Sequence, residues 1–183
     1  SNVLATSLEN IGAVFHPALT LLSAGWIEST GGDFEYYLQG ISPAVARVLE
    51  RVDAERLAVA GALGVRTVSA REWLYLAYDS HGDDLCAAIK DTSGYAGIKA
   101  PATIDHRYVW EDVPMSLVPM SSIGAMLGVP TPTIDMVINL AGIMSGRDFR
   151  ADGRTVATLG IEGMSVEQIH RLVMEGEAER RVP

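Results

Sequence analysis

The sequence predicts a single all-α domain of about six to eight helices. Helix start and stop signals recur along the chain, such as Ser42-Pro43 at one start and Gly146 and Gly176 at two ends. Few segments alternate between apolar and polar residues with the period of two that a half-buried strand needs, and no strand–helix–strand rhythm is present. With 183 residues, 48% of them hydrophobic, the chain is long enough to bury one sizeable core.

The first expected helix begins at Pro17 and continues to Trp26, which places His16 immediately before a helix start. The segment Tyr36-Tyr37-Leu38 is compatible with a short strand or an extended stretch. A long helix is then expected from Ser42-Pro43 to Gly64, because serine caps a helix and proline suits its first turn. Helical spacing puts four apolar residues on one face of it: Val45, Val48, Leu49 and Val52.

Three further helices carry their own start signals. Ser69-Ala70-Arg71-Glu72 has the form of a capping box and opens a helix through Leu76. Thr131-Pro132 opens a helix that Gly146 can end, and its apolar positions are Ile134, Val137, Ile138 and Ala141. Ser165-Val166-Glu167-Gln168 is a second capping box, and Gly176 ends the helix that follows it.

Two segments between these helices differ in character. Residues 93–113 are punctuated by glycine and proline and are expected to form a long loop, which in a compact domain is often functional. Residues 117–146 are so apolar that they resemble a membrane span. Pro119, Pro130 and Pro132 divide them into pieces too short to cross a bilayer, so we expect core helices and no membrane partner.

Composition excludes several classes of partner. A formal net charge of -9, with no lysine- or arginine-rich run, disfavours nucleic acid and anionic membranes. The single cysteine, Cys86, permits no intrachain disulfide and suits a reducing cytoplasm, where we expect the protein to reside. No secretory signal opens the chain.

The sequence contains no local motif for binding a cofactor or a metal, and none that marks a catalytic nucleophile. The chain has no Gly-x-Gly-x-x-Gly, no Walker sequence and no Gly-x-Ser-x-Gly elbow, and its four histidines lie at no metal-ligand spacing. The remaining groups of interest are His16, Arg107 and Asp112. Taken alone, His16 is more often a structural histidine, Asp112 is compatible with a helix cap, and Arg107 with a surface charge. Nothing in the bare sequence brings the three together.

Several short blocks occur in a fixed order between Asn10 and Gly163. They are His16-Pro17, Tyr36-Tyr37-Leu38-Gln39-Gly40-Ile41-Ser42-Pro43, Val52-Asp53-Ala54-Glu55-Arg56, Tyr95-Ala96-Gly97-Ile98, Arg107-Tyr108, Glu111-Asp112-Val113-Pro114, Leu117-Val118-Pro119, Pro130-Thr131-Pro132, Ile134-Asp135, Gly153-Arg154-Thr155 and Leu159-Gly160. On these blocks the chain resembles the C-terminal all-helical domain of the octopine/nopaline (opine) dehydrogenase family. The likeness covers nearly the whole chain.

The resemblance implies a single multi-helix domain over residues 1–183, of the kind that follows a Rossmann domain in opine and 6-phosphogluconate-type dehydrogenases. It implies an NAD- or NADP-dependent reductive condensation of an amino acid with a 2-keto acid such as pyruvate. The N-terminal dinucleotide-binding domain is absent from this chain, so the cofactor-binding residues are unknown. We expect the isolated chain to be inactive. It is either a piece of the enzyme or a natural protein whose cofactor domain is another chain.

The resemblance also assigns roles to residues. The family's catalytic histidine falls on His16, its acid partner on Asp112 and its carboxylate-binding arginine on Arg107, and both the His-Pro pair and the Arg-x-x-x-x-Asp spacing are intact. An imidazole can move a proton near neutral pH, a carboxylate can fix its tautomer, and a guanidinium fork can bind a substrate carboxylate. The partners implied are the two substrates, the N-terminal Rossmann domain and a second copy in a homodimer.

Two other functions are compatible with the sequence. One is a non-catalytic helical module for dimerisation or ligand binding that keeps the pocket residues. The other is a related two-domain dehydrogenase that reduces a 2-keto acid without an amine. In either case we expect an exposed apolar face where another domain or a second copy would pack.

Overall fold

The structure, a computed structural model, describes residues 2–176. Within them lie eleven α-helices, a 3₁₀ turn and a π-helical segment, and the sole pairing of extended residues is an isolated antiparallel bridge between Glu35 and Lys99. The elements are α1 (Val3–Leu8), α2 (Gly12–Leu22), α3 (Ala24–Thr30), α4 (Pro43–Ala62), α5 (Ala70–Tyr78), α6 (Leu85–Asp91), η1 (Ser93–Tyr95), α7 (Arg107–Trp110), η2 (Val113–Leu117), α8 (Val118–Leu127), α9 (Pro132–Ser145), α10 (Phe149–Asp152) and α11 (Val166–Glu175). The all-α prediction is confirmed.

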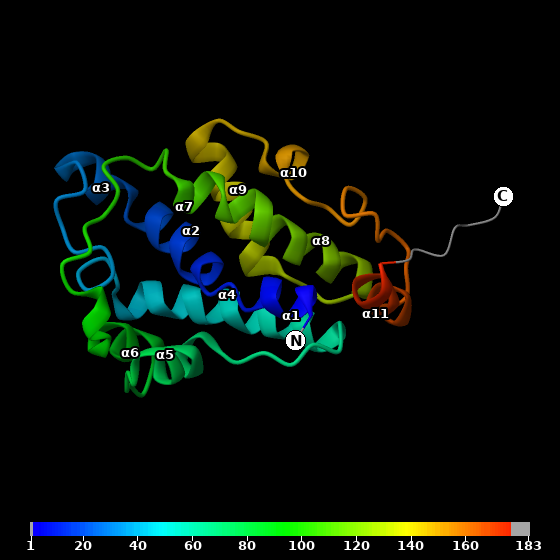
Figure 1. The fold of residues 1–183 in the computed structure, drawn as a ribbon. Helices are drawn as coiled ribbons and strands as arrows, with labels where there is room; N and C mark the ends of the chain where they lie inside the picture. The colour runs from blue at the N-terminus through cyan, green and yellow to red at the C-terminus, as the bar shows by residue number, and fades with distance from the viewer. Residues whose placement is uncertain (1, 177–183) are drawn as a thin grey trace.

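The long helix α4 organises the molecule. It contacts α1, α2, α6, α8 and α9 and runs between two groups of helices (Figure 1). Helices α5 and α6 lie on one side of α4, whereas α1, α2, α8 and α9 lie on the other (Figure 1). Across the part of the chain that the structure describes, no helix has both the length and the apolar character needed to span a membrane.

Several of the expected start and stop signals act as the sequence predicts. Ser42 accepts the N–H of Val45 to cap α4, at 3.2 Å. Ser165 and Gln168 make both halves of the capping box that opens α11. Gly146 and Gly176 end α9 and α11 with φ of 67° and 74°, a left-handed conformation that glycine adopts without a steric penalty.

The expected start of the first helices is wrong. An earlier helix, α1, precedes them, and Pro17 lies inside α2, five residues after its start at Gly12. A proline inside a helix removes one backbone hydrogen bond, but α2 continues because its apolar side chains, among them Phe15 and Leu19, are almost fully buried. The Tyr36 hydroxyl donates to the backbone carbonyl of His16 at 3.0 Å, next to the proline. His16 is therefore a mid-helix residue.

Other expectations also change. The helix count exceeds six to eight because five of the α-helices have four to seven residues, too few to show an amphipathic period. Residues 36–38 form a turn beside the Glu35–Lys99 bridge, not a strand. The 93–113 segment is largely irregular, as expected, but it contains α7.

Arg56 on α4 is fully buried and joins three segments of the chain. Its Nε and Nη2 atoms donate to the Asp53 carboxylate at 2.9 and 2.6 Å. Nη1 donates to the carbonyl of Leu8 at the end of α1, and Nη2 to that of Val68 before α5. Asp53 also accepts the N–H of Ala70, the first residue of α5, at 2.8 Å. These bonds satisfy the buried charge and fix α1 and α5 against α4.

The neighbouring residue, Glu55, caps a helix that lies far away in sequence. Its carboxylate accepts the N–H of Thr133 at 2.9 and 3.0 Å and that of Ile134 at 2.9 Å. Helix α9 begins at Pro132, as predicted from Thr131-Pro132, but the Thr131 side chain makes no capping bond. A carboxylate at a helix N-terminus also suits the helix dipole. The start of α9 is thus fixed against α4 by a tertiary contact.

We predict that Arg56→Ala lowers the free energy of unfolding by about 3–5 kcal/mol, because it leaves the Asp53 carboxylate and two carbonyls buried without their partner. Urea denaturation of the chain measures this. Arg51→Ala is the matched control, since Arg51 is an exposed arginine on the same helix and its loss should change the free energy by no more than about 0.5 kcal/mol. Equal unfolding midpoints for the two variants would contradict the assignment.

Candidate active site

His16 and Asp112 are in direct contact although 96 residues separate them. The His16 Nδ1 and Asp112 Oδ2 atoms lie 2.8 Å apart. Helix α2 carries His16 and packs against both α7 and η2, the elements on either side of Asp112. The two side chains are 21% and 17% exposed, so the pair is sheltered but open to solvent on one side. Asp112 does not cap the segment that follows it, which leaves its carboxylate for the imidazole.

The second ring nitrogen of His16 also has a partner. Nε2 lies 2.9 Å from the Tyr37 hydroxyl oxygen. A carboxylate can only accept a hydrogen bond, so Nδ1 donates to Asp112 and the neutral ring keeps its lone pair on Nε2. Burial, and next the nearby Tyr95, raise the pKa of Tyr37 far above its usual value, so its phenol stays protonated. The Tyr37 hydroxyl therefore donates to Nε2 of the neutral ring.

Aromatic rings fix the plane of the imidazole. The Tyr108 ring stacks on the His16 ring with centroids 3.9 Å apart and an interplanar angle of 17°. Tyr36 also stacks on Tyr108, with centroids 5.3 Å apart, and its hydroxyl is hydrogen-bonded to that of Thr20 at 2.7 Å. Sequence reasoning gave these tyrosines no role. The available signal was that Tyr36 and Tyr108 lie in two of the ordered blocks on which the family resemblance rests.

A hollow of about 320 Å³ opens beside the dyad. Its walls come from α2, α5 and the residues around η1, and they are mostly aromatic. The lining residues are Glu9, Asn10, Ile11, Gly12, Phe15, His16, Tyr37, Trp73, Tyr78 and Tyr95. Tyr37 stacks on Tyr95 with centroids 4.0 Å apart. An organic molecule of a few carbon atoms that enters this hollow lies next to His16 and Tyr37.

Arg107, the third residue expected in the site, lies apart from the dyad. Its side chain is 65% exposed and its Nη2 pairs with Glu111 Oε2 at 3.0 Å, one helical turn along α7. Within residues 2–176, no contact joins it to His16 or Asp112. It nevertheless directly precedes Tyr108, whose ring covers His16. Its guanidinium is therefore available to a charged group that approaches from solvent.

His106 caps α7 from the position directly before its first residue, Arg107. Its Nδ1 accepts the N–H of Tyr108 at 3.4 Å, and its ring meets the Tyr108 ring edge-on at 4.4 Å. Burial, followed by the charges of Arg107 and His16, lowers the pKa of His106. A neutral ring keeps the acceptor that this cap needs. His106 thus supports the position of Tyr108.

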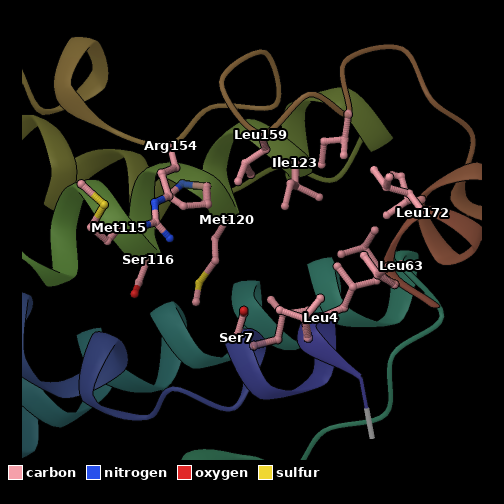
Figure 2. Close-up of a pocket in the computed structure, with 16 residues that line it drawn as sticks. Leu4, Ser7, Leu63, Met115, Ser116, Met120, Ile123, Arg154, Leu159 and Leu172 are labelled. Atoms are coloured by element: carbon pink, nitrogen blue, oxygen red, sulfur yellow. The ribbon is translucent and has the colours of Figure 1, made fainter. Parts of the chain in front are cut away.

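A second hollow is an apolar groove. The Asn10–Ser116 hydrogen bond joins the two, because Asn10 lines the hollow beside the dyad and Ser116 lines the groove. The groove has a volume of about 230 Å³ and runs between α1, α8 and α11, with Arg154 and Ser116 at one end and Leu63 and Leu172 at the other (Figure 2). Apart from Ser7, its remaining walls are apolar, as Figure 2 shows for Leu4, Met115, Met120, Ile123 and Leu159. An exposed apolar surface is what the sequence led us to expect.

The sequence and fold of this chain are similar to those of known dehydrogenases. A family model described as NAD/NADP octopine/nopaline dehydrogenase, alpha-helical domain, matches residues 1–145. The opine dehydrogenase of Arthrobacter sp. (strain 1C) is 42% identical over 172 residues, which cover 94% of this chain and 48% of that protein. The octopine dehydrogenase of Mizuhopecten yessoensis is 28% identical over 162 residues, covering 75% of this chain and 40% of that protein. The chain thus spans about half the length of these relatives.

Solved structures show the same fold. The structure of octopine dehydrogenase with NADH and agmatine superposes with a TM-score of 0.74 at 20% identity, over 98% of this chain and 51% of that one. A second, of octopine dehydrogenase with NADH and L-arginine, gives a TM-score of 0.68 at 22% identity, over 94% and 49%. At these identities the likeness establishes the fold alone, and it confirms the predicted multi-helix domain.

We predict that Gly12→Ala displaces the His16 ring. A Cβ atom at position 12 would lie 2.9 Å from His16 Cε1 and 3.1 Å from Nδ1. The ring cannot yield freely, because Asp112, Tyr37 and Tyr108 hold it. A crystal structure of the variant should show the Nδ1–Oδ2 distance lengthened beyond hydrogen-bond range, about 3.2 Å.

Gly25→Ala on α3 is the matched control. A Cβ atom there meets nothing within 4 Å, so that variant should keep the dyad and gain about 0.5–1 kcal/mol of stability from the higher helix propensity of alanine. An unchanged His16–Asp112 contact in Gly12→Ala would contradict the prediction and would mean that the start of α2 shifts to accommodate the new Cβ atom while the ring keeps its place.

Proposed function

The chain belongs to the octopine/nopaline dehydrogenase family as its alpha-helical domain, and we propose that it is the substrate-binding and catalytic half of an NAD(P)-dependent opine-type dehydrogenase. The whole enzyme would join the amine of an amino acid to a 2-keto acid such as pyruvate and reduce the resulting imine. The observation that carries this proposal is the His16–Asp112 contact at the edge of an open hollow.

The proposed chemistry of this half is proton transfer. When the amine nitrogen attacks the keto carbon, a C–N bond forms and the carbonyl electron pair moves to the oxygen, which needs a proton. The same oxygen later leaves as water and needs a second proton. His16 can supply and recover these protons near neutral pH. Asp112 holds the proton on Nδ1 and stabilises the imidazolium, as carboxylates do in acyl-transfer triads.

The substrates would occupy the hollow and its rim. The amino acid's side chain would lie against Trp73, Tyr78 and Tyr95, which line the hollow. Arg107 would bind a substrate carboxylate, because a guanidinium matches a carboxylate with two hydrogen bonds. This role requires Arg107 to exchange its exposed ion pair with Glu111 for the substrate, which costs little because solvent screens such pairs.

The cofactor would be held elsewhere in the enzyme. The described residues are helices and loops with a single β-bridge, and none of the glycines among residues 2–176 belongs to a Gly-x-Gly-x-x-Gly loop, so this part of the chain offers no dinucleotide cradle. We propose that an N-terminal Rossmann domain binds NAD or NADP, whose reduced form supplies the hydride. The apolar groove is a surface that this domain or a second copy would cover, and the homodimer stays a prediction.

We predict that His16→Ala and Asp112→Asn each lower kcat by about 10²–10⁴-fold in the complete enzyme, meaning this chain joined to its dinucleotide-binding domain. The assay follows oxidation of the reduced cofactor with an amino acid and pyruvate. His81→Ala is the control, because His81 is exposed and pairs only loosely with Asp79, at 3.4 Å. Normal turnover by His16→Ala would reject the proposal. Turnover with no need for an amine would favour a simple 2-keto acid reductase.

We predict that Arg107→Gln raises KM for the keto acid or the amino acid by about 10- to 100-fold, the equivalent of losing a charge-assisted contact of about 1.5–3 kcal/mol. The effect on kcat should be smaller, since the contact exists both before and during the reaction. Steady-state kinetics of the complete enzyme separates the two constants. Arg51→Gln, an exposed arginine on α4, should leave both unchanged. Equal KM values for the two variants would show that Arg107 does not bind a substrate carboxylate.

A further inference from the structure

We propose that Tyr37 is the group through which His16 exchanges protons with the substrate. The inference rests on the proposed function and adds a third member to the His16–Asp112 pair. It starts from the arrangement of the imidazole nitrogens. Asp112 occupies Nδ1 at 2.8 Å, so Nε2 is the nitrogen left to give and take a proton. The Tyr37 hydroxyl oxygen stands 2.9 Å from that nitrogen.

The Tyr37 hydroxyl blocks direct access to Nε2. For a substrate oxygen to bind Nε2 itself, the hydroxyl would have to leave, and the ring that carries it is tightly held. Tyr37 is 6% exposed. It stacks on Tyr95 at 4.0 Å and meets the Tyr36 ring edge-on at 4.9 Å. The turn that carries it is fixed by the hydrogen bond from Tyr36 N–H to the Ile98 carbonyl, at 2.8 Å. A relay through the hydroxyl avoids this displacement.

The Tyr37 hydroxyl can also both donate and accept a proton, as a relay requires. Burial raises its pKa, so the hydroxyl holds a proton to donate and lone pairs to accept one. Tyr37 and His16 both line the hollow beside the dyad. A substrate oxygen in that hollow can therefore meet the phenol while the phenol meets Nε2.

The relay step is balanced. The substrate oxygen takes the proton of the Tyr37 O–H bond, and the phenol oxygen takes the proton of the Nε2–H bond in the same step. The electron pair of the broken N–H bond stays on the imidazole, which becomes neutral, and the positive charge passes to the substrate. Tyr37 ends the step as it began, as a neutral phenol. The reverse sequence returns a proton from substrate to His16.

The experiment varies the acidity of the phenol with little change in its shape. Fluorotyrosines of increasing fluorine content are placed at position 37 of the complete enzyme, together with Tyr37→Phe. We expect Tyr37→Phe to lower kcat about 100-fold or more with a small change in KM. We expect the logarithm of kcat across the fluorotyrosines to change linearly with phenol acidity. Tyr75→Phe removes a hydroxyl from an exposed tyrosine on α5 and should match the wild type.

Each outcome separates the alternatives. Wild-type kcat in Tyr37→Phe would overturn the relay. A loss in Tyr37→Phe with no dependence on acidity among the fluorotyrosines would also overturn it, because the phenol would then only position His16. The fluorotyrosine series remains decisive if Tyr37→Phe fails to fold. If His16→Ala keeps normal turnover, the proposed function itself fails. If His16→Ala loses activity but kcat does not change across the Tyr37 variants, the His16–Asp112 dyad is supported and the relay through Tyr37 is rejected.

Discussion

The rest of the fold depends on the hydrogen bonds of one buried guanidinium group on α4. Arg56 pairs with Asp53 and binds the backbone at the end of α1 and before α5, while the adjacent Glu55 caps α9. A charge buried this deeply is tolerated only when all its donors are satisfied, so these segments have little freedom to shift relative to α4. Helix α2 packs on this same frame, and with it the candidate dyad.

The dyad lies beside a proline within α2. Pro17 cannot donate a backbone hydrogen bond, and Tyr36 binds the carbonyl of the preceding residue, His16. The His16 side chain then reaches Asp112, where a short π-helical segment begins. Deviations of this kind often occur at functional sites, because regular helices rarely aim two remote side chains at each other.

Tyrosines give the site its rigidity. Tyr36, Tyr37, Tyr95 and Tyr108 form a chain of ring contacts around His16, and burial keeps the phenol of Tyr37 protonated. Rings with few rotatable bonds hold their polar atoms in place at a low entropic cost. Such a wall suits proton transfer, which requires donor and acceptor to stay within hydrogen-bond distance. The same wall limits what can enter the hollow.

By itself, the sequence determined the features that arise from nearby residues. The all-α class, the Ser42 and Ser165 caps and the glycine stops are set by hydrogen bonds within a few residues, and the ordered blocks identified the family. Tertiary structure decided the rest. The continuation of α2 through Pro17, the cap that Glu55 gives to α9, and the partners of His16 all join groups far apart in the chain. Local patterns do not encode such contacts, because they form only when burial of the whole core brings the helices together.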